Sequence, residues 1–248
     1  MTRFATLLFA CSLSLATARA GEIEVYFWQM TPEGDAEVGT DGRGGTRADL
    51  EDDLGYGSEE DVLGFRASIG KRHQLGIAGF NIDAKARNRI DRTIRFADNT
   101  FRVSENVTTS LDMQFAQVYY KYRLGHRLLN GGLIAGAQYI QIDAKATSDR
   151  LGSASEEVDA PMPIVGVFAQ SQPIGMLRLR GNLIYSDFDI EDVEATYTEF
   201  EISAMLHVKN FFGGIGYRDI AIEAEEDSVP VVADISLTGP MAFIGMRW

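Results

Sequence analysis

The feature that most constrains this chain is a repeated segment of roughly ten residues in which apolar and polar residues alternate. The segments are rich in Val, Ile, Tyr and Phe, and clusters of Gly, Asn, Asp and Pro separate them. Alternation with a period of two predicts β-strands that have one apolar face. No long stretch shows the helical spacing of apolar residues. Ten segments qualify: 23–28, 62–70, 75–84, 107–124, 132–144, 163–172, 177–188, 193–209, 214–222 and 231–248.

The connections between these segments alternate in length. Short ones lie at 71–74, 125–130, 173–175 and 210–213, and longer, more charged ones at 32–61, 85–106, 147–159 and 224–230, with a brief one near Glu191. Short turns at one end and long loops at the other are typical of outer-membrane barrels. A soluble sandwich has no reason to sort its connections in this way. The sequence therefore predicts an all-β fold, a transmembrane antiparallel up-and-down β-barrel of about ten strands, with eight or twelve left open.

The first twenty residues have the pattern of a secretory signal peptide. Arg3 precedes an apolar stretch over 4–18, and a small-x-small end follows at 18–20. The barrel domain is then expected over 21–248. A lipoprotein cleavage site before Cys11 is the alternative, but the apolar segment ahead of it is short. Because Cys11 is the only cysteine, the mature chain can form no disulfide and use no thiol chemistry.

The charge balance excludes one large class of function. The chain has 23 Lys and Arg against 36 Asp and Glu, a formal net charge of −13. Nucleic-acid binding depends on a surplus of cations, so no nucleic-acid partner is expected. No apolar run reaches the 18 or more residues of a membrane helix. The expected location is the outer membrane of a Gram-negative cell.

Period two also assigns faces to each strand. In 193–209, Phe200 and Ile202 share an outward face, while Glu199 and Glu201 share the inward one. In 107–124 the apolar set changes phase after Met113, which predicts a β-bulge near residues 115–116. A charge network is expected in a narrow or plugged lumen. Its predicted members are Arg66, Asp83, Lys121, Asp143, Arg178, Arg180, Asp189, Glu199, Glu201, Lys209 and Arg247.

One short sequence occurs twice. Asn-Ile-Asp-Ala-Lys-Ala at 81–86 recurs at 141–146 with Gln in the first place, and 188–191 is a looser copy. Each copy falls near the loop end of an upward strand. The repeat therefore predicts that Asp83, Asp143 and Asp189 reach the outer rim.

The end of the chain carries a resemblance. An alternating strand that finishes at an aromatic residue, here Phe-Ile-Gly-Met-Arg-Trp over 243–248, resembles the last strand of bacterial outer-membrane β-barrel proteins. The resemblance implies that Trp248, with Met246 and Ile244 on the same face, forms part of the signal read by the barrel-assembly machinery. Residues 49–55, of the form D-L-x-D-D-L-G, are similar to an acidic segment of an uncharacterised proteobacterial outer-membrane β-barrel family. Neither likeness implies an activity.

Candidate chemistry is sparse. His73, His126 and His207 are all expected at the periplasmic end, whereas outer-membrane proteases and lipid A deacylases, as families, use histidine near the outer leaflet. No catalytic residue, metal site or cofactor is therefore predicted. The carboxylates of the first loop are interpreted as solvated surface, with weak calcium or magnesium binding as the alternative.

The second long loop is basic. Arg92, Arg95 and Arg102 are candidate contacts for lipopolysaccharide phosphates, because arginine binds phosphate with two parallel hydrogen bonds. Pairing with the acidic first loop is the alternative. The predicted function is thus a non-enzymatic outer-membrane barrel that presents charged loops to lipopolysaccharide or a partner. A narrow channel, an enzyme that uses rim carboxylates and a soluble periplasmic protein stay as successive alternatives.

Overall fold

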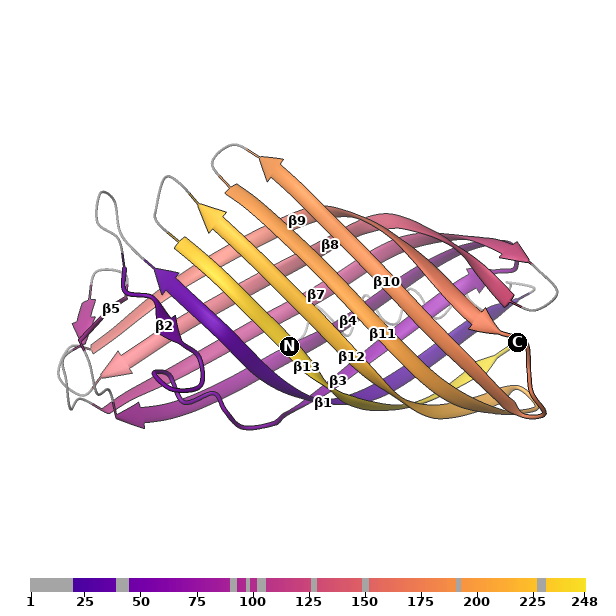
Figure 1. Ribbon diagram of the computed structural model, residues 1–248, viewed down its shortest axis with the longest axis horizontal. Coiled ribbons are helices and arrows are strands. Elements are labelled where there is room, and N and C mark those ends of the chain that lie inside the picture. The colour runs from indigo at the N-terminus through magenta and orange to yellow at the C-terminus, as the bar shows by residue number, and fades with distance from the viewer. Residues whose placement is uncertain are drawn as a thin grey trace, which may run out of the picture.

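The described residues form a closed barrel of ten long antiparallel strands (Figure 1). A computed structural model describes residues 20–38, 45–89, 93–96, 99–101, 106–125, 129–148, 152–190, 193–226 and 231–248. Among these residues no helix is long and apolar enough to cross a membrane. The long strands are β1 (Gly21–Val38), β3 (Glu60–Gly70), β4 (His73–Arg89), β7 (Asn106–Gly125), β8 (Leu129–Ser148), β9 (Gly152–Ser171), β10 (Leu177–Ile190), β11 (Val193–Val208), β12 (Phe211–Glu226) and β13 (Val231–Arg247). The short strands are β2 (Ala48–Asp49), β5 (Ile94–Phe96) and β6 (Asn99–Phe101).

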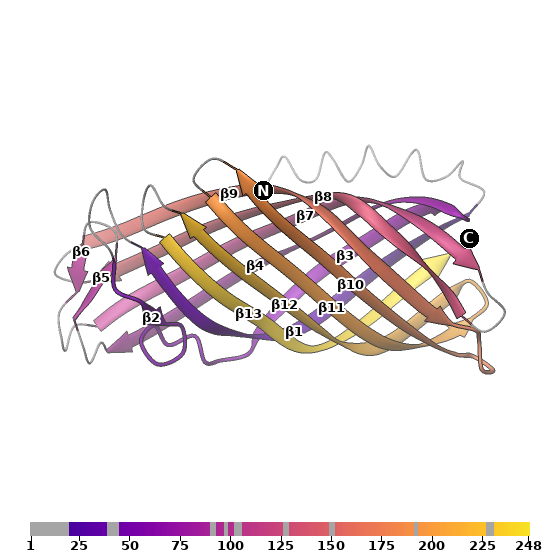
Figure 2. The same ribbon diagram turned by 45° about the horizontal axis from the view of Figure 1, so that its top comes forward.

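The topology is up-and-down. Each long strand pairs with the next along the chain, and β13 pairs with β1 from Glu22↔Arg247 to Val38↔Val231, which closes the sheet. The closed sheet has no free edge strand, which is the condition for a sheet to lie in lipid. Figure 2 shows the same tilted strands from a second direction. The predicted fold class and the count of ten strands are confirmed.

The two ends of the barrel differ. Short connections, such as the two residues between β3 and β4, lie at the end that holds the chain's C-terminus, and β2 and β5 lie at the opposite end (Figure 1). We call the part of the barrel next to the short connections the turn half. The part next to β2 and β5 is the loop half.

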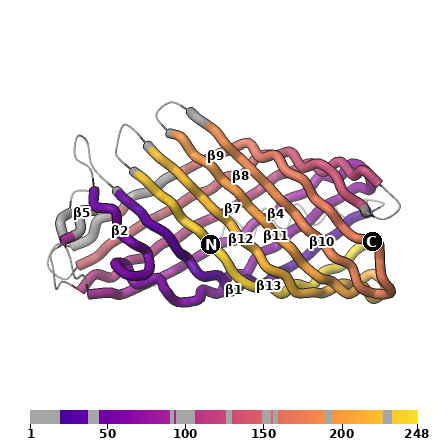
Figure 3. The backbone as a smooth tube through the Cα atoms, in the orientation of Figure 1, coloured from indigo at the N-terminus to yellow at the C-terminus, as the bar shows by residue number. Residues whose placement is uncertain are grey.

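Most of the long strands exceed the length that a membrane requires, and three of them are about twice as long. β7, β8 and β9 each have 20 residues, whereas a transmembrane strand needs roughly 9–11. At about 3.3 Å per residue and a tilt of about 40°, 20 residues rise about 50 Å, twice the apolar band of about 25 Å. The tubes of Figure 3 continue through both halves. The loop expected over 147–159 is therefore mostly strand, because β8 runs to Ser148 and β9 begins at Gly152.

The apolar face changes sides between the halves. In the turn half the outward side chains are apolar and exposed: Leu63 is 68% exposed, Ile215 69% and Ile244 72%. In the loop half the outward positions are polar, as at Asp83 and Lys85 of β4, while the alternate residues Ile82 and Ala84 are buried. The exposed apolar side chains of the turn half form a belt of the kind that a bilayer covers.

The prediction of a β-bulge in β7 is wrong. Phe80, Phe115 and Ile140 lie directly opposite one another on β4, β7 and β8, and the pairing runs one to one through this row. Met113 and Phe115 are inward and buried, and Val118 is outward. The apparent change of phase in the sequence is thus a change of the surroundings of the strand and not a slip of its backbone.

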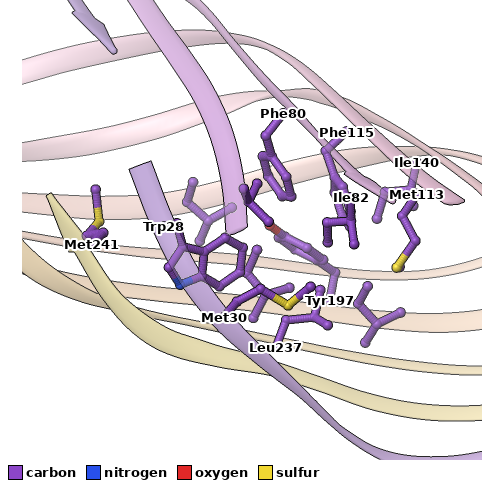
Figure 4. Close-up of a cluster of buried hydrophobic side chains, with 14 of the residues drawn as sticks. Trp28, Met30, Phe80, Ile82, Met113, Phe115, Ile140, Tyr197, Leu237 and Met241 are labelled. Carbon is purple, nitrogen blue, oxygen red and sulfur yellow. The ribbon is translucent and has the colours of Figure 1, made fainter. Parts of the chain in front are cut away.

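The loop half has a hydrophobic interior (Figure 4). Trp28 is fully buried, its ring meets Phe80 edge-on at 5.8 Å between centroids, and Phe80 stacks on Phe115 at 4.3 Å. The indole nitrogen of Trp28 donates a hydrogen bond of 3.2 Å to the Gly239 carbonyl. Side chains from strands around the barrel complete the cluster, among them Met30, Met113, Ile140, Tyr197, Leu237 and Met241.

In the turn half, inward aromatic rings lie over glycines on the neighbouring strand. Tyr119 is directly opposite Gly76, and a Cβ added there would come within 2.3 Å of the ring. Tyr26 lies opposite Gly64 in the same way. The other pairs are Phe168–Gly132, Phe212–Gly245 and Phe243–Gly214. Glycine is required at these positions because the ring occupies the space of its missing side chain.

Replacing Gly76 with alanine should displace the Tyr119 ring and destabilise the barrel by about 1–3 kcal/mol, the usual cost of overpacking. Gly181→Ala is the matched control, because a Cβ there meets nothing closer than 3.7 Å. Urea unfolding in lipid vesicles, followed by tryptophan fluorescence, measures both. Equal effects of the two substitutions would contradict this reading of the rings.

Candidate functional site

A ring of four charged side chains crosses the lumen of the turn half. Glu24 of β1 and Glu201 of β11 are buried, and the guanidinium groups of Arg66 on β3 and Arg180 on β10 contact both carboxylates. The Arg180 pairs measure 2.6 Å to Glu24 and 3.1 Å to Glu201, and Arg66 Nη1 lies 3.0 Å from Glu201. Alternation of sign around the ring pairs each buried charge twice, which offsets the cost of removing it from water.

A second pair marks the boundary with the hydrophobic core. Arg218 and Glu199 are buried and lie 2.9 Å apart, and the Tyr197 hydroxyl donates to Glu199 at 2.8 Å. The Arg218 guanidinium also lies 5.1 Å from the Trp28 ring centroid and 4.7 Å from that of Phe80. Arg218 therefore joins the ion pairs of the turn half to the aromatic cluster of the loop half through cation–π contacts.

The predicted charge network is partly rearranged. The structure places Arg66, Lys121, Arg178, Arg180, Glu199, Glu201 and Arg247 on the inward face of the turn half and its boundary. Asp83 and Asp143 were expected in the lumen, but they lie on outward positions, because the polar face of β4 and β8 is the outer one in the loop half. Lys209 is an exposed turn residue with a φ of 55°, outside the lumen. Asp189 pairs with Glu194 through its backbone, and its side chain lies outside the described residues.

Sequence reasoning missed four lumen charges. Glu22 and Glu24 of β1, Arg123 of β7 and Arg218 of β12 all face inward, and Arg247 Nε donates to Glu22 at 2.9 Å. Period-two alternation with the exposed Ile23, Val25 and Phe27 could have identified both glutamates.

Outward aspartates surround the barrel just beyond the apolar belt. Asp83 of β4, Asp112 of β7 and Asp143 of β8 lie directly opposite one another. The repeated sequence therefore flanks β7 symmetrically, with Asp83 and Asp143 on either side of Asp112. Burial and the neighbouring Asp83 raise the pKa of Asp112. We call the outward set the acidic collar: Asp61, Asp83, Asp112, Asp143, Asp159, Asp187, Asp219 and Asp234.

The acidic D-L-x-D-D-L-G segment completes the wall of the loop half. Its first residue, Asp49, ends β2, which pairs with Asp35 and Ala36 of β1. The Asn88 side chain of β4 donates to the Asp52 and Asp53 carbonyls at 2.7 and 3.2 Å. Because β3 begins only at Glu60, the segment occupies the space above it, between β1 and β4.

The aspartates of this segment hold its own turn. Asp49 Oδ1 accepts from the backbone N–H groups of Glu51 and Asp52 at 2.9 and 2.7 Å, and Asp53 Oδ2 accepts from the N–H of Asp49 at 2.8 Å. Gly55 has a φ of +84°, which favours glycine. Leu50 and Tyr56 are buried on the core, and burial raises the pKa of Tyr56 to about 12. The motif thus has a structural role at each of these positions.

The described histidines lie at the turn end. His73 begins β4, where its Nδ1 lies against the Tyr120 hydroxyl, and His207 lies near the end of β11, where its Nε2 is 3.1 Å from the Met205 sulfur. His126 lies outside the described residues. Neither described histidine has a carboxylate partner in the part of the chain that the structure describes.

The remaining predicted sites are only partly described. Arg92 and Arg102 lie outside the described residues, as does the predicted signal peptide up to residue 19, and only the backbone of Arg95 is described, in β5. At the chain's end, Trp248 exchanges two backbone hydrogen bonds of 3.0 Å with Gly21, and Ile244 and Met246 face outward. The predicted role of these three residues in assembly stays a prediction.

The geometry is that of a closed antiparallel β-barrel with an apolar outer belt, and a solved outer-membrane barrel has the same fold. The outer membrane protease OmpT from Escherichia coli matches with a TM-score of 0.58 at 12% identity, covering 94% of this chain and 97% of that one. The transport unit of the autotransporter AIDA-I from Escherichia coli matches at 0.46 and 12%, covering 97% of each chain, and Ail from Yersinia pestis at 0.33 and 13%, covering 92% and 99%. No protein family and no curated protein matches the sequence. At these identities the likeness to OmpT shows the fold alone.

Replacing Glu201 with glutamine should destabilise the barrel by about 3–5 kcal/mol, because Arg66 and Arg180 each lose one of two buried counter-charges. Glu194→Gln on the exposed outer face of the same strand is the control and should change stability little. The urea midpoint in vesicles measures both. A Glu201→Gln variant as stable as the control would contradict a structural role for the ring.

Replacing Asp112 with asparagine should stabilise the barrel at pH 7 by about 0.2–1 kcal/mol, because like charges directly opposite repel. The pKa of Asp112 is raised in the folded state, so the folded state binds the proton more tightly than the unfolded state. The free energy of unfolding of the parent should therefore fall as the pH rises from about 3.9, the usual aspartate pKa, through the raised value.

The Asp112→Asn variant should lose less stability over that pH range than the parent. Asp219→Asn is the control, because its neighbours across the strands are Phe200 and Thr238. Thermal midpoints at low ionic strength measure the series. A destabilised Asp112→Asn, or a pH dependence equal to that of the parent, would contradict the repulsion.

Proposed function

We propose that this protein is a non-enzymatic integral outer-membrane barrel whose loop half projects from the cell as a solid, charged column. The observation that carries the proposal is the exchange of faces along the strands. The turn half has the apolar exterior of a lipid-embedded barrel, and the loop half has the polar exterior and apolar interior of a water-soluble one. The loop end then faces the outside and the turn end the periplasm.

The filled interior supports a barrel that does not conduct. Trp28, Met113, Tyr197 and Leu237 come from four strands and are fully buried in the loop half. Barrels of about eight strands are already filled by side chains, whereas open porins have 16 or more. A continuous aqueous path would have to displace this packed cluster. The narrow channel is accordingly the alternative.

The separation of candidate groups supports the absence of catalysis. His73 and His207 lie at the turn end, whereas Asp83 and Asp143 lie on the outer wall of the loop half. A general base must reach its proton within hydrogen-bond distance, and this separation prevents the two sets from acting together. OmpT, whose fold is similar, is a protease by its description. Peptide hydrolysis on overexpression would favour an enzyme instead.

The acidic collar bears on the proposed contact with lipopolysaccharide. Its carboxylates stand where the barrel leaves the apolar belt and repel the lipid's phosphates. The cations of the second loop, Arg92, Arg95 and Arg102, have the complementary sign and the geometry for phosphate. We therefore propose that this loop, and not the collar, provides the direct contact. Membership of the uncharacterised proteobacterial barrel family, and Trp248 as the assembly signal, belong to the same proposal.

Planar bilayers with the folded protein should show no discrete conductance steps at neutral pH, because the loop half is packed. Trp28→Ala with Phe80→Ala is the comparison, since loss of two large side chains from the centre of the cluster should open a path or cause noisy leakage. Heat-modifiable gel mobility checks that each protein is folded. Regular single-channel steps from the parent would favour the channel.

Replacing Arg92, Arg95 and Arg102 together with serine should reduce the amount of lipopolysaccharide that co-purifies with the barrel. Lys85→Ser with Lys145→Ser is the control, because both lysines are exposed on the outer face beside the collar. Phosphate analysis of detergent extracts measures the bound lipid. Unchanged co-purification by the triple variant would remove the lipid contact.

A further inference from the structure

The lumen of the turn half contains more cations than its carboxylates can pair. Arg66 and Arg180 share Glu24 and Glu201, Arg218 is paired with Glu199, and Arg247 with Glu22. Within the described part of the chain, three further inward cations have no carboxylate at ion-pair distance: Lys121, Arg123 and Arg178. Positive charge left unpaired inside a membrane-embedded barrel is costly, so a counter-ion from solution is expected.

Two of these cations line a cavity. It has a volume of about 60 Å³, and its charged lining consists of five cations and two carboxylates: Arg66, Lys121, Arg123, Arg180 and Arg247, with Glu22 and Glu24. The two carboxylates are paired with Arg247, Arg66 and Arg180, so the charge of Lys121 and Arg123 is left over. At roughly 15 Å³ for each water, it has room for about four waters or one small oxyanion. The cavity is therefore large enough for a small oxyanion and too small for an extended ligand.

The cavity opens toward the turn end. A wider vestibule of about 580 Å³ shares Gln74, Arg123 and Arg247 with it and has Lys71 and Arg72 at its mouth. On the other side, the ring of Glu24, Arg66, Arg180 and Glu201 and then the hydrophobic core separate it from the loop end. The vestibule is thus lined by four cations and one side-chain carboxylate, that of Glu22, which is paired with Arg247, and the net positive field attracts anions.

The cations are held in place but lack acceptors. Lys121 Nζ lies 4.7 Å from the Tyr119 ring centroid and 5.5 Å from that of Phe168, and the Arg123 guanidinium lies 5.9 Å from Phe168. The Nε atoms of Arg123 and Arg178 are both buried, and neither has a hydrogen-bond partner. Buried donors without partners are rare and costly in native proteins. An oxyanion would supply both acceptor oxygens and negative charge.

We propose that this cavity binds a small oxyanion of the phosphate or carboxylate class that enters from the turn end. Lys121 and Arg123 supply the charge and the donors, and Arg247 flanks the entrance while it remains paired with Glu22. Two sources offer the same chemistry, a free ion and the phosphate of a membrane lipid's headgroup. This binding site lies in the turn half and does not depend on any contact between the loop half and lipopolysaccharide.

The test uses the full folded barrel in a neutral detergent, with chloride replaced by inorganic phosphate at constant ionic strength. Phosphate should raise the unfolding midpoint of the parent, with a shift of about 100-fold in the unfolding equilibrium at 100 times its Kd. The Lys121→Met, Arg123→Met double variant should lose this shift. Without phosphate at low ionic strength, the double variant should be more stable than the parent, because repulsion among the cations is relieved.

Lys85→Met with Arg87→Met is the matched control, since it removes the same two residue types at the same spacing from the exposed face of β4. The control should keep the phosphate shift of the parent. Should the double variant not fold, Lys121→Gln alone should reduce the affinity for phosphate at least about tenfold.

Vesicles of zwitterionic lipid with and without phosphatidylglycerol distinguish the sources. Protection by free phosphate indicates a soluble ion, and protection only by the anionic lipid, lost in the double variant, indicates a headgroup. Both results support the proposal. Phosphate protection that is equal in the parent and the double variant, or absent from the parent under both conditions, would overturn it.

Discussion

The period of two in a β-strand is the constraint on which this structure depends. Each residue added to a strand points to the side opposite its neighbour, so a strand can present only two faces. Here one strand passes through two surroundings. In the turn half the outer face is apolar and the inner face is charged, and in the loop half these properties are exchanged without any break in the pairing of β4, β7 and β8. The long strands run through both halves, although the pairing of β9 with β10 ends at Tyr185↔Val165.

The interior changes with the exterior. In the turn half the apolar side chains point outward toward lipid, so the inward side chains are polar. Glu24, Arg66, Arg180 and Glu201 form ion pairs across the lumen there. Because water surrounds the loop half, its lumen can hold the hydrophobic core that an ordinary soluble barrel has. Arg218 stands at the boundary, with Glu199 on one side and the rings of Trp28 and Phe80 on the other. The closed lumen that we propose would therefore come from side-chain packing within the described barrel.

The fold could be predicted from the sequence, and the orientation of the loop-half side chains could not. The ten alternating segments and the sorted connections identify the barrel and its topology, because both depend only on period and spacing. The inference failed where it assumed that apolar side chains always face outward. That assumption placed Asp83 and Asp143 in the lumen and required a bulge near Phe115, although both observations follow from a strand that leaves the membrane. The role of the 49–55 segment depends on contacts with Asn88 and with β1, which no local pattern contains.

The exchange of faces is the central claim, and single cysteines on β8 test it most directly, since the chain's only cysteine lies in the predicted signal peptide. Three positions on β8 represent the three surroundings: Ala135 is outward in the apolar belt, Lys145 is outward in the loop half, and Ala146 beside it is buried. A water-soluble maleimide applied to intact cells should label Lys145→Cys rapidly and spare Ala135→Cys and Ala146→Cys. Rapid labelling of Ala146→Cys together with protection of Lys145→Cys would mean that the polar face of the loop half points inward, and would contradict the account.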